Sequence, residues 1–527
     1  MELEKNFTPH PDEGKIPAVK MRNITKAFGT VLANDRVWLD IYRGEILALL
    51  GENGSGKTTL MNMLAGIYFP DSGQILVDGE EVAIRSPRDA FDLKIGMIHQ
   101  HFKLVDVFTA AENIVLGLKE KGKFDRKAIS RQIREISARY GFDLDPDKKI
   151  YDMAVSEKQT VEIIKVLYRG ADILILDEPT AVLTPQETEK LFAVLRNMKA
   201  DGKSIVIITH KLNEVMAISD RVSILRKGEY IDTVETRTTN PQALTDMMVG
   251  HAVTLNIDRP EPADPQRRLV VKDLTCLDGQ GVKVLDGVSF SAQGGEILGI
   301  AGIAGSGQKE LCEAIAGLHP VSSGQILYSN PKEPDQVESL VGRTPMEIRE
   351  LGVSLAFVPE DRLGMGLVGS MGMTGNMMLK SYNQSGRFFP DTKPFRTLAE
   401  EIREKLEVVT PSVNTPVRKL SGGNVQKVLV GREIASAPAL LMAAYPVRGL
   451  DINASYTIYR LLNEQKAKGV AVIYVGEDLD VLLELCDRIL VLCGGRVSGI
   501  ADGRTVTKEE IGLMMTQTGE VGDHDRT

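Results

Sequence analysis

Short runs of aliphatic and β-branched residues alternate with longer amphipathic stretches along most of the chain. Residues 46–50, 173–176 and 205–208 are continuous apolar runs, and each precedes turn residues and then a helical spacing of apolar positions. Apolar runs of about four to eight residues are typical of strands buried on both faces, as in a parallel sheet covered by helices. The pattern therefore predicts an α/β fold built on mainly parallel sheets.

The chain also contains an internal repeat. GEIL at 44–47 recurs at 295–298, and SGQIL at 72–76 recurs at 323–327 with the same displacement. Matching segments further along are displaced by a larger distance, so the second half holds additional residues. We expect these residues to lengthen a surface loop, because loops tolerate insertions better than packed elements do.

Chain length and the repeat together predict two domains. A chain of 527 residues exceeds the roughly 250–300 residues at which a single core stops growing. Residues 254–268 (TLNIDRPEPADPQRR) hold three prolines and several charges without apolar periodicity, which is typical of a linker. We place the domains at 15–253 and 269–515, with polar tails at 1–14 and 516–527.

Charge and hydropathy argue against two broad classes of function. The chain has 63 Lys and Arg against 72 Asp and Glu, a net charge of −9, which disfavours nucleic acid as a partner. No apolar run approaches the roughly 20 residues of a membrane-spanning helix, and the amino-terminal segment is polar without an apolar leader core. We therefore expect the chain to stay in the cytoplasm.

A phosphate-binding motif follows the first apolar run. GENGSGKT at 51–58 fits the P-loop pattern, G-x-x-x-x-G-K followed by Ser or Thr, between a predicted strand and a predicted helix. Backbone N–H groups of such a loop face phosphate oxygens, Lys57 reaches the β- and γ-phosphates, and the Thr58 hydroxyl ligates magnesium. The residues predicted to bind nucleotide here are Gly51, Glu52, Asn53, Gly54, Ser55, Gly56, Lys57, Thr58 and Thr59.

Two carboxylates, Asp177 and Glu178, follow the apolar run at 173–176. A strand that ends in two carboxylates is, on its own, more often a solvated turn. The P-loop upstream favours a catalytic pair instead. Asp177 is then predicted to hold magnesium, and Glu178 to polarise the water that attacks the phosphate.

Three further motifs carry a family resemblance. Gln100 lies in GMIHQHF, His210 follows the run at 205–208, and LSGGN occupies 420–424. With these motifs in this order, the chain resembles the ABC ATPase family over nearly its whole length. The resemblance implies two tandem P-loop NTPase domains, each a mainly parallel sheet with helices and a helical subdomain that carries the signature motif.

The resemblance also implies ATP and Mg²⁺ as cofactors and gives roles to individual residues. Gln100 contacts Mg²⁺ and senses the membrane subunit, and His210 contacts the γ-phosphate, a role suited to a neutral imidazole. Catalysis is assigned to Glu178, His210 and Lys57, and Mg²⁺ binding to Thr58, Gln100 and Asp177. The signature residues expected to contact ATP are Leu420, Ser421, Gly422, Gly423 and Asn424.

The second domain lacks the residues that this chemistry needs. Its P-loop has Gln308 where the lysine belongs and Lys309 where the hydroxyl belongs, and one helix position is a turn of ~100°, so the Lys309 ammonium is expected to point elsewhere. The two Walker B carboxylates, the Q-loop glutamine and the switch histidine are replaced by Ala444, Tyr445, Glu360 and Glu477. We expect no hydrolysis there, because added negative charge repels a polyphosphate.

The first domain has the complementary defect. MAVSE at 153–157 stands as far before Asp177 as LSGGN stands before Ala444, and it lacks the serine and second glycine of the motif. In ABC proteins two domains close head to tail, so each ATP lies between one P-loop and the other domain's signature. This pairing would gather the intact motifs in one composite site and the defective ones, with Thr184 in place of Asp451, in the other.

Finer resemblances point to solute import. PEDR at 359–362 and AAYPVRGLD at 443–451 resemble the ribose and galactose import ATPases, and MIHQHFKLVDVFTAAENIVLG resembles their nucleoside-import relatives. This implies two membrane permease subunits and an extracytoplasmic solute-binding protein or lipoprotein as partners, with a peripheral position on the cytoplasmic face of the cell membrane. It leaves sugar and nucleoside open as solutes.

A soluble tandem ABC ATPase acting without membrane partners is the alternative function. Such proteins usually keep both sites intact and carry a long charged inter-domain segment or zinc-binding cysteines, whereas this chain has a short proline-rich linker and no paired cysteines. Two further questions stay open: whether the domains pair within one chain or between chains, and whether Phe28 stacks on adenine or packs in the core.

Overall fold

The computed structural model describes residues 16–29, 31–99, 102–118, 125–181, 183–250, 257–262, 265–331, 333–350, 355–359, 361–379, 391–448, 450 and 452–516. The chain divides into two compact units, Met1–Thr254 and Leu255–Thr527, each with its own hydrophobic cores. None of the described helices is long and apolar enough to cross a lipid bilayer.

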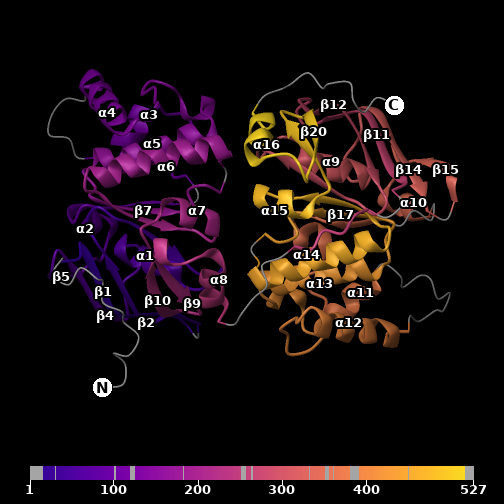
Figure 1. Cartoon of the computed structure of the whole chain (residues 1–527), viewed down its shortest axis with the longest axis horizontal. Coiled ribbons are helices and arrows are strands. Elements are labelled where there is room, and N and C mark those ends of the chain that lie inside the picture. The colour runs from indigo at the N-terminus through magenta and orange to yellow at the C-terminus, as the bar shows by residue number, and fades with distance from the viewer. Residues whose placement is uncertain are drawn as a thin grey trace. The chain divides into compact units, whose positions relative to one another are not determined.

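The first unit contains two sheets and their surrounding helices (Figure 1). Its strands are β1 (Val19–Phe28), β2 (Val31–Ile41), β3 (Ile46–Leu50), β4 (Ser72–Val77), β5 (Glu80–Val82), β6 (Ile95–Ile98), β7 (Ile173–Asp177), β8 (Ser204–Ile208), β9 (Arg221–Arg226) and β10 (Glu229–Glu235). Its helices are α1 (Lys57–Leu64), α2 (Pro87–Asp92), α3 (Ala110–Val115), α4 (Arg126–Tyr140), α5 (Val155–Tyr168), α6 (Pro185–Ala200), α7 (Leu212–Ile218) and α8 (Pro241–Val249), with 3-10 turns η1 (Ile150–Asp152) and η2 (Thr236–Thr238).

The six-stranded sheet, in the order β10-β9-β3-β8-β7-β6, positions the candidate site. All its pairings are parallel except β9 with β10, and every residue of β3, β7 and β8 is buried, which confirms the α/β prediction. Because β3, β8 and β7 are neighbours, their carboxyl ends open at one edge, where ligands of open α/β sheets bind. That edge carries the P-loop after Leu50, the carboxylates of Asp177 and Glu178, and Thr209 with His210.

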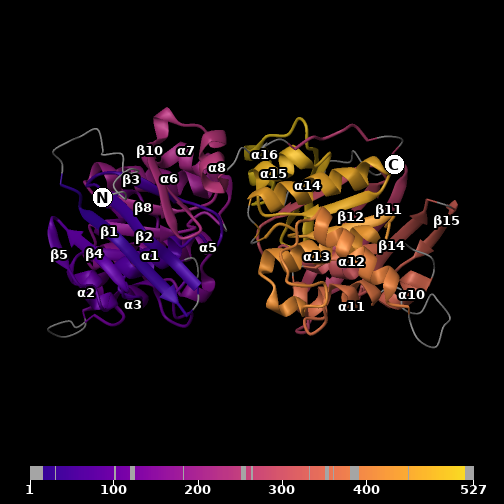
Figure 2. The same cartoon turned by 90° about the horizontal axis from the view of Figure 1, so that it is seen from below.

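Two further groups of elements accompany the six-stranded sheet in the first unit. The antiparallel strands β2-β1-β4-β5 lie side by side in Figure 2 and share a core with α1 and one face of β3, which includes Met21, Leu49 and Leu60. Helices α3, α4 and α5 gather at the opposite end in Figure 1, around a separate core that includes Ile133 and Val161. This helical subdomain is joined to the six-stranded sheet through α5, because Ile163 and Val166 also belong to the core that contains Leu174 of β7.

The second unit repeats this plan. Its strands are β11 (Arg267–Leu277), β12 (Lys283–Gln293), β13 (Ile297–Gly302), β14 (Ser323–Asn330), β15 (Glu333–Ser339), β16 (Leu355–Val358), β17 (Leu440–Ala444), β18 (Ala471–Val475), β19 (Arg488–Cys493) and β20 (Arg496–Asp502). Its helices are α9 (Gln308–Ile315), α10 (Pro345–Glu350), α11 (Met373–Met378), α12 (Lys393–Lys405), α13 (Gly422–Ala435), α14 (Ile452–Ala467), α15 (Leu479–Leu485) and α16 (Lys508–Met514), with the π-helical turn η3 (Arg362–Gly366) and the 3-10 turn η4 (Val417–Lys419).

The strand orders of the second unit, β12-β11-β14-β15 and β16-β17-β18-β13-β19-β20, match those of the first strand by strand. The additional residues were expected in a surface loop, yet part of them lengthens a hairpin, because β14 and β15 are longer than β4 and β5. An extended hairpin pairs its own backbone N–H and C=O groups, so strand residues can be inserted without leaving them unsatisfied.

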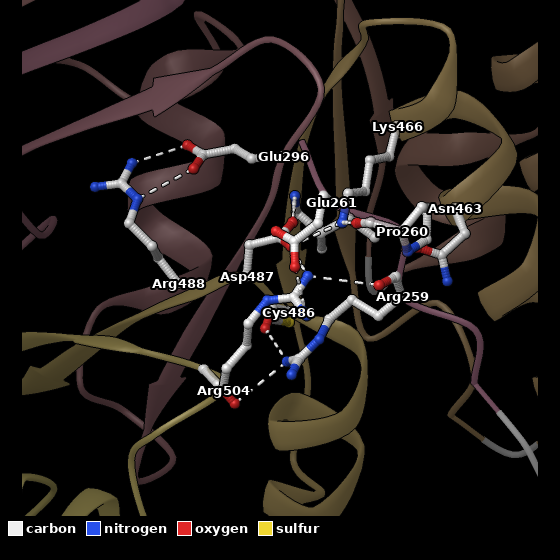
Figure 3. Close-up of polar contacts among 12 residues, drawn as sticks. Arg259, Pro260, Glu261, Glu296, Asn463, Lys466, Cys486, Asp487, Arg488 and Arg504 are labelled. Carbon is white, nitrogen blue, oxygen red and sulfur yellow. Dashed lines mark hydrogen bonds and ion pairs between the residues drawn. The ribbon is translucent and has the colours of Figure 1, made fainter. Parts of the chain in front are cut away.

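Residues 257–262, within the segment predicted as a linker, pack against the second unit (Figure 3). Arg259 Nη1 donates to the carbonyls of Leu483 at 2.8 Å, Cys486 at 2.6 Å and Gly503 at 3.2 Å. Because Nη1 carries two hydrogens, at least one of them is shared between two of these carbonyls. The proline-rich composition therefore marks a docked strap in this stretch and not a free tether.

Pro260 of this strap completes a buried ion pair (Figure 3). Lys466 Nζ lies 2.7 Å from Asp487 Oδ1 and also donates to the Pro260 carbonyl, and the two charged side chains are 1% and 7% exposed. Asp487 Oδ2 accepts from the N–H of Ile297 at 2.8 Å, at the start of β13. The strap is thus joined through one ion pair to the central strand of the second sheet.

Candidate functional site

Residues 51–56 form the turn between β3 and α1, with the glycines in conformations that other residues avoid. Gly54 has φ 83° and Gly56 has φ 95°, and a Cβ at Gly56 would lie 2.3 Å from the carbonyl oxygen of Ala33. Only glycine fits there. The turn leads the first N–H groups of α1 toward any anion placed above it.

Lys57 is folded into this loop. Its Nζ donates to the carbonyls of Gly51 at 2.7 Å and Glu52 at 2.9 Å, and the residue is 7% exposed. Burial lowers the pKa of Lys57 to about 8, and the nearby carboxylates of Glu178 and Asp177 only partly offset that effect. Phosphate oxygens bound next to Nζ would raise the pKa of Lys57 again and so favour its charged form.

Oxygen ligands for a hard cation meet beside Lys57. Thr58 Oγ1 donates to Asp177 Oδ2 at 3.2 Å, joining the first turn of α1 to the end of β7. Burial raises the pKa of Asp177, since the carboxylate is removed from water. A hydroxyl and a carboxylate at this spacing suit Mg²⁺, which takes few protein oxygens and completes its shell with phosphates and water.

Glu178 stands at the mouth of the site in a strained backbone conformation. Its φ is 46°, in the left-handed region, and its N–H donates to the Ile208 carbonyl at 2.9 Å. Its Oε1 lies 2.9 Å from His210 Nδ1, and this hydrogen bond lowers the pKa of Glu178 against the effect of burial. An ionised carboxylate fixed at the end of a strand is suited to accept a proton from water.

Some predicted site residues lie outside the described part of the chain: Gln100, Glu360 and Asp451. Phe28 lies within it at 44% exposure, with its ring edge-on to Tyr68 at 5.1 Å between centroids. The core alternative for Phe28 is therefore wrong. Stacking on adenine stays a prediction.

The second unit keeps the backbone of this site with different side chains. Gln308 Nε2 donates to the Ile303 carbonyl at 3.2 Å, much as Lys57 bonds its own loop, and Lys309 Nζ lies 3.8 Å from Glu313. Tyr445 has φ 50°, the same strained conformation as Glu178. A cavity of about 300 Å³ remains here, lined by Lys309, Cys312, Glu313, Asp361, Ala444 and Tyr445.

The two signature segments differ at their helix starts. Ser421 caps α13, and its Oγ accepts from the Asn424 side-chain Nδ2 at 2.9 Å. At the start of α5, Ala154 has no such hydroxyl, and its N–H donates instead to the Glu157 carboxylate at 2.8 Å. An acidic side chain thus occupies the anion-attracting end of α5, whereas the end of α13 carries no such carboxylate.

A known protein family matches the chain twice, once in each of its two units. The ABC transporter family model matches residues 34–181 and 285–446. The chain is 42% identical over 502 residues to the nucleoside import ATP-binding protein NupA of Lactococcus lactis, covering 94% of this chain and 97% of NupA. The chain belongs to the ABC transporter family. Members of this family hydrolyse ATP, and this chain is an ATPase with two ABC cassettes.

Two further proteins complete the comparison. The glucose import ATP-binding protein TsgD13 of Haloferax volcanii is 40% identical over 540 residues, with 96% of each chain covered. The archaeal ribosome recycling factor aABCE1, solved with the stalk protein aP1, matches with a TM-score of 0.59 over 91% of this chain and 90% of its own. At 17% identity, this last likeness concerns the fold alone.

Two polar side chains support the backbone of the cassettes through contacts that the sequence did not predict. Asn34, fully buried in β2, donates through Nδ2 to the Gly56 carbonyl at 3.3 Å and so supports the P-loop. Arg362 in the second cassette donates to the Gly422 carbonyl at 3.0 Å. Both side chains bond backbone carbonyls, and because every residue type supplies the same carbonyl oxygen, no sequence motif specifies such a contact.

The pKa of Lys57 predicts proton uptake when ATP binds. Phosphate oxygens favour the charged ammonium, so the pKa rises on binding, and near pH 8 about half a proton is taken up per ATP. Affinity should fall as the pH rises through 8, because the free protein then loses the charge. Isothermal titration in buffers of different ionisation enthalpy measures the uptake. Lys57→Arg, which stays charged, should abolish it; equal uptake in both proteins would contradict the assignment.

Proposed function

We propose that this chain is the ATP-hydrolysing subunit of an importer that moves a nucleoside or a simple sugar through two membrane permease subunits. One observation carries the proposal: the first cassette brings Lys57, Asp177, Glu178 and His210 to one sheet edge, and the second keeps an intact LSGGN. Relatives named for nucleoside import and for glucose import are almost equally identical to the chain, which supports the solute class without choosing within it.

Chemistry at the competent site follows from these side chains. Mg²⁺ would be held by Thr58 and Asp177, with Gln100 from the family resemblance, and it supplies positive charge to the phosphates. Lys57 neutralises the β- and γ-phosphates, while Glu178 accepts a proton from the attacking water. His210, hydrogen-bonded to Glu178, keeps that carboxylate ionised and turned toward the water.

The two cassettes would contribute unequally to hydrolysis. In the head-to-tail pairing, Ser421 and the N–H groups at the start of α13 complete the phosphate cage of the first cassette's ATP. The other composite site joins Gln308 and Tyr445 to the Glu157-capped α5, where neither phosphate charge nor a general base is provided. The first is the working site, and the second supports no hydrolysis.

The proposed partners follow from the import function. Two permease subunits would receive the closing motion, an extracytoplasmic solute-binding protein or lipoprotein would deliver the solute, and the chain would lie peripherally on the cytoplasmic face of the membrane. Such ATPases close around ATP and reopen after hydrolysis, so that chemistry is coupled to the access of the permease.

Uptake by the reconstituted complex tests this proposal. The chain and its permease partners are placed in vesicles, and ATP-driven uptake of labelled nucleosides and of labelled ribose, galactose and glucose is measured. We expect uptake from one of these two classes. Ser421→Arg should lower it at least tenfold, because the side chain enters the phosphate cage, whereas Ala154→Arg should leave it near wild type.

Comparison of Ser421→Arg with Ala154→Arg distinguishes failure of the unequal-site assignment from failure of the importer function. Equal loss in both variants would contradict the unequal roles of the composite sites. ATP hydrolysis that is neither stimulated by permeases nor linked to uptake of any solute would overturn the importer function and favour a soluble tandem ATPase.

A further inference from the structure

Arg362 connects three segments of the second cassette. It follows β16 and begins η3, where the Asp361 carboxylate accepts from the N–H of Gly364 at 2.8 Å. Its Nη1 donates to the Gly422 carbonyl at 3.0 Å, and its Nη2 donates to the Arg448 carbonyl. One guanidinium therefore joins the segment after β16, the signature motif and the segment after β17.

The contact lies directly on the signature motif. Gly422 is the first residue of α13, next to Ser421, and a Cβ at Gly422 would lie 3.1 Å from Arg362 Nη1. A contact of 3.1 Å would force the Arg362 side chain to shift. The absence of a Cβ at Gly422 therefore leaves room for the guanidinium. The arginine thus holds the turn that presents the N–H groups of α13.

Arg448, whose carbonyl accepts from Arg362, is a second arginine in this region. The Arg448 side chain lies 3.9 Å from the carboxylate of Glu477, which stands where the first cassette has His210. The residue that corresponds to Arg448 in the first cassette is Ala181, by the same displacement that relates Tyr445 to Glu178. The positions of Ala181 and His210 in the first cassette are thus occupied in the second by Arg448 and Glu477, which contact each other.

The signature helix of the first cassette is anchored differently. In α5, Gln159 Nε2 donates to the Pro179 carbonyl at 2.6 Å, just after the catalytic carboxylates. The counterpart in α13 is Gln426, and among the described residues neither polar atom of its buried side chain has a hydrogen-bond partner. Phe102 stands at the place of Arg362. In the first cassette Gln159 joins the signature helix to the segment after β7. In the second cassette Arg362 joins the start of the signature helix to the segment after β17.

We propose that Arg362 is a positioning residue for the competent ATP site, because it fixes the LSGGN turn to the segments after β16 and β17. The inference rests on the proposed head-to-tail pairing, in which that turn caps the ATP of the first cassette. Charge-assisted bonds from a rigid fork to two carbonyls fix direction as well as distance. A lysine offers a single ammonium and cannot hold both carbonyls in the same geometry.

Steady-state kinetics of the full chain with its permeases test the role. R362Q should lower kcat for ATP hydrolysis about tenfold while KM for ATP changes less than about threefold, because the P-loop of the other cassette is untouched. R362K should fall between R362Q and wild type. The melting temperature of each variant should stay within about 3 °C of wild type, which separates positioning from a loss of fold.

Arg343→Lys is the matched control, since Arg343 also donates to a carbonyl of this cassette, that of Ser339 at 2.9 Å, away from the signature. It should keep wild-type kcat. The inference is overturned if R362Q and R343K have the same kcat, or, should R362Q fail to fold, if R362K equals wild type. A wild-type complex without ATP turnover would instead overturn the proposed function.

Discussion

Exchange of Glu178 for glutamine is expected to lower ATP turnover by about 10²- to 10⁴-fold, the range that a positioned general base contributes. The glutamine amide matches the carboxylate in size but cannot accept a proton. Because Lys57 and Thr58 are untouched, the variant should still bind ATP. The pKa of Glu178 is held low by its hydrogen bond to His210, so the wild-type carboxylate is ready at neutral pH.

Tyr445 provides the control at the same place in the other cassette. Glu178 and Tyr445 have φ of 46° and 50°, and their N–H groups donate to the carbonyls of Ile208 at 2.9 Å and Val475 at 2.8 Å. Tyr445→Ala changes the side chain in the same backbone setting, and turnover should stay within about twofold of wild type, since no chemistry is assigned there.

Phosphate release by the purified complex with its permeases measures both variants, and equilibrium binding of ATP is measured in parallel. Equal loss at Glu178 and Tyr445 would mean that both cassettes hydrolyse ATP. No loss at Glu178 would remove it from the mechanism. Loss of ATP binding in Glu178→Gln would show that the substitution disturbs the site beyond the proton transfer.

The motifs of the proposed ATP site in the first cassette could be recognised from sequence because each is local. A P-loop needs its glycines and lysine within eight positions, and the carboxylates follow a buried run directly. The adjacency of β3, β8 and β7 is different, since strands far apart in the chain must pair and no local pattern specifies their order. The hydrogen bond between Glu178 and His210 depends on that order.

Contacts to backbone carbonyls were beyond prediction for another reason. Arg259 and Arg362 each donate to backbone carbonyl oxygens. Because every residue type has the same carbonyl oxygen, the identity of the acceptor residue does not indicate the contact. The prolines and charges at 254–268 predicted a linker between the domains; prolines disfavour regular structure, but they do not prevent docking of an extended segment. The strap at 257–262 and the signature support at Arg362 therefore emerge only from the fold.

Lys466→Met is expected to lower the free energy of unfolding of the second cassette by about 3 kcal/mol, as for a buried ion pair that loses one partner. Methionine is unbranched like lysine and replaces most of its apolar stem, but it leaves the Asp487 carboxylate, 7% exposed, without its ammonium. Arg504, 3.6 Å from Asp487, offsets part of the loss and places the cost at the lower end of the usual range.

The duplicated chain supplies an internal control for this substitution. Lys199 and Asp220 form the corresponding pair in the first cassette, but they are 35% and 39% exposed, whereas the strap covers the pair of Lys466. Lys199→Met should therefore cost less than about 1 kcal/mol, as for other solvated pairs. The contrast measures what the strap adds, since both pairs join a lysine to an aspartate but the strap buries only the pair of Lys466 and gives it the Pro260 carbonyl as a further acceptor.

Urea denaturation followed by circular dichroism gives the cost of each variant, and fluorescence of Trp38, the one tryptophan of the chain, reports the first cassette separately. Lys466→Met should also speed hydrogen exchange at 257–262, because the Pro260 carbonyl loses its donor. A similar cost for both lysines would mean that the strap does not shield the pair. A large cost without faster exchange at the strap would mean that the strap is held without Lys466, by the Arg259 side chain and by Asn463, whose Nδ2 donates to the Asp258 carbonyl at 2.6 Å.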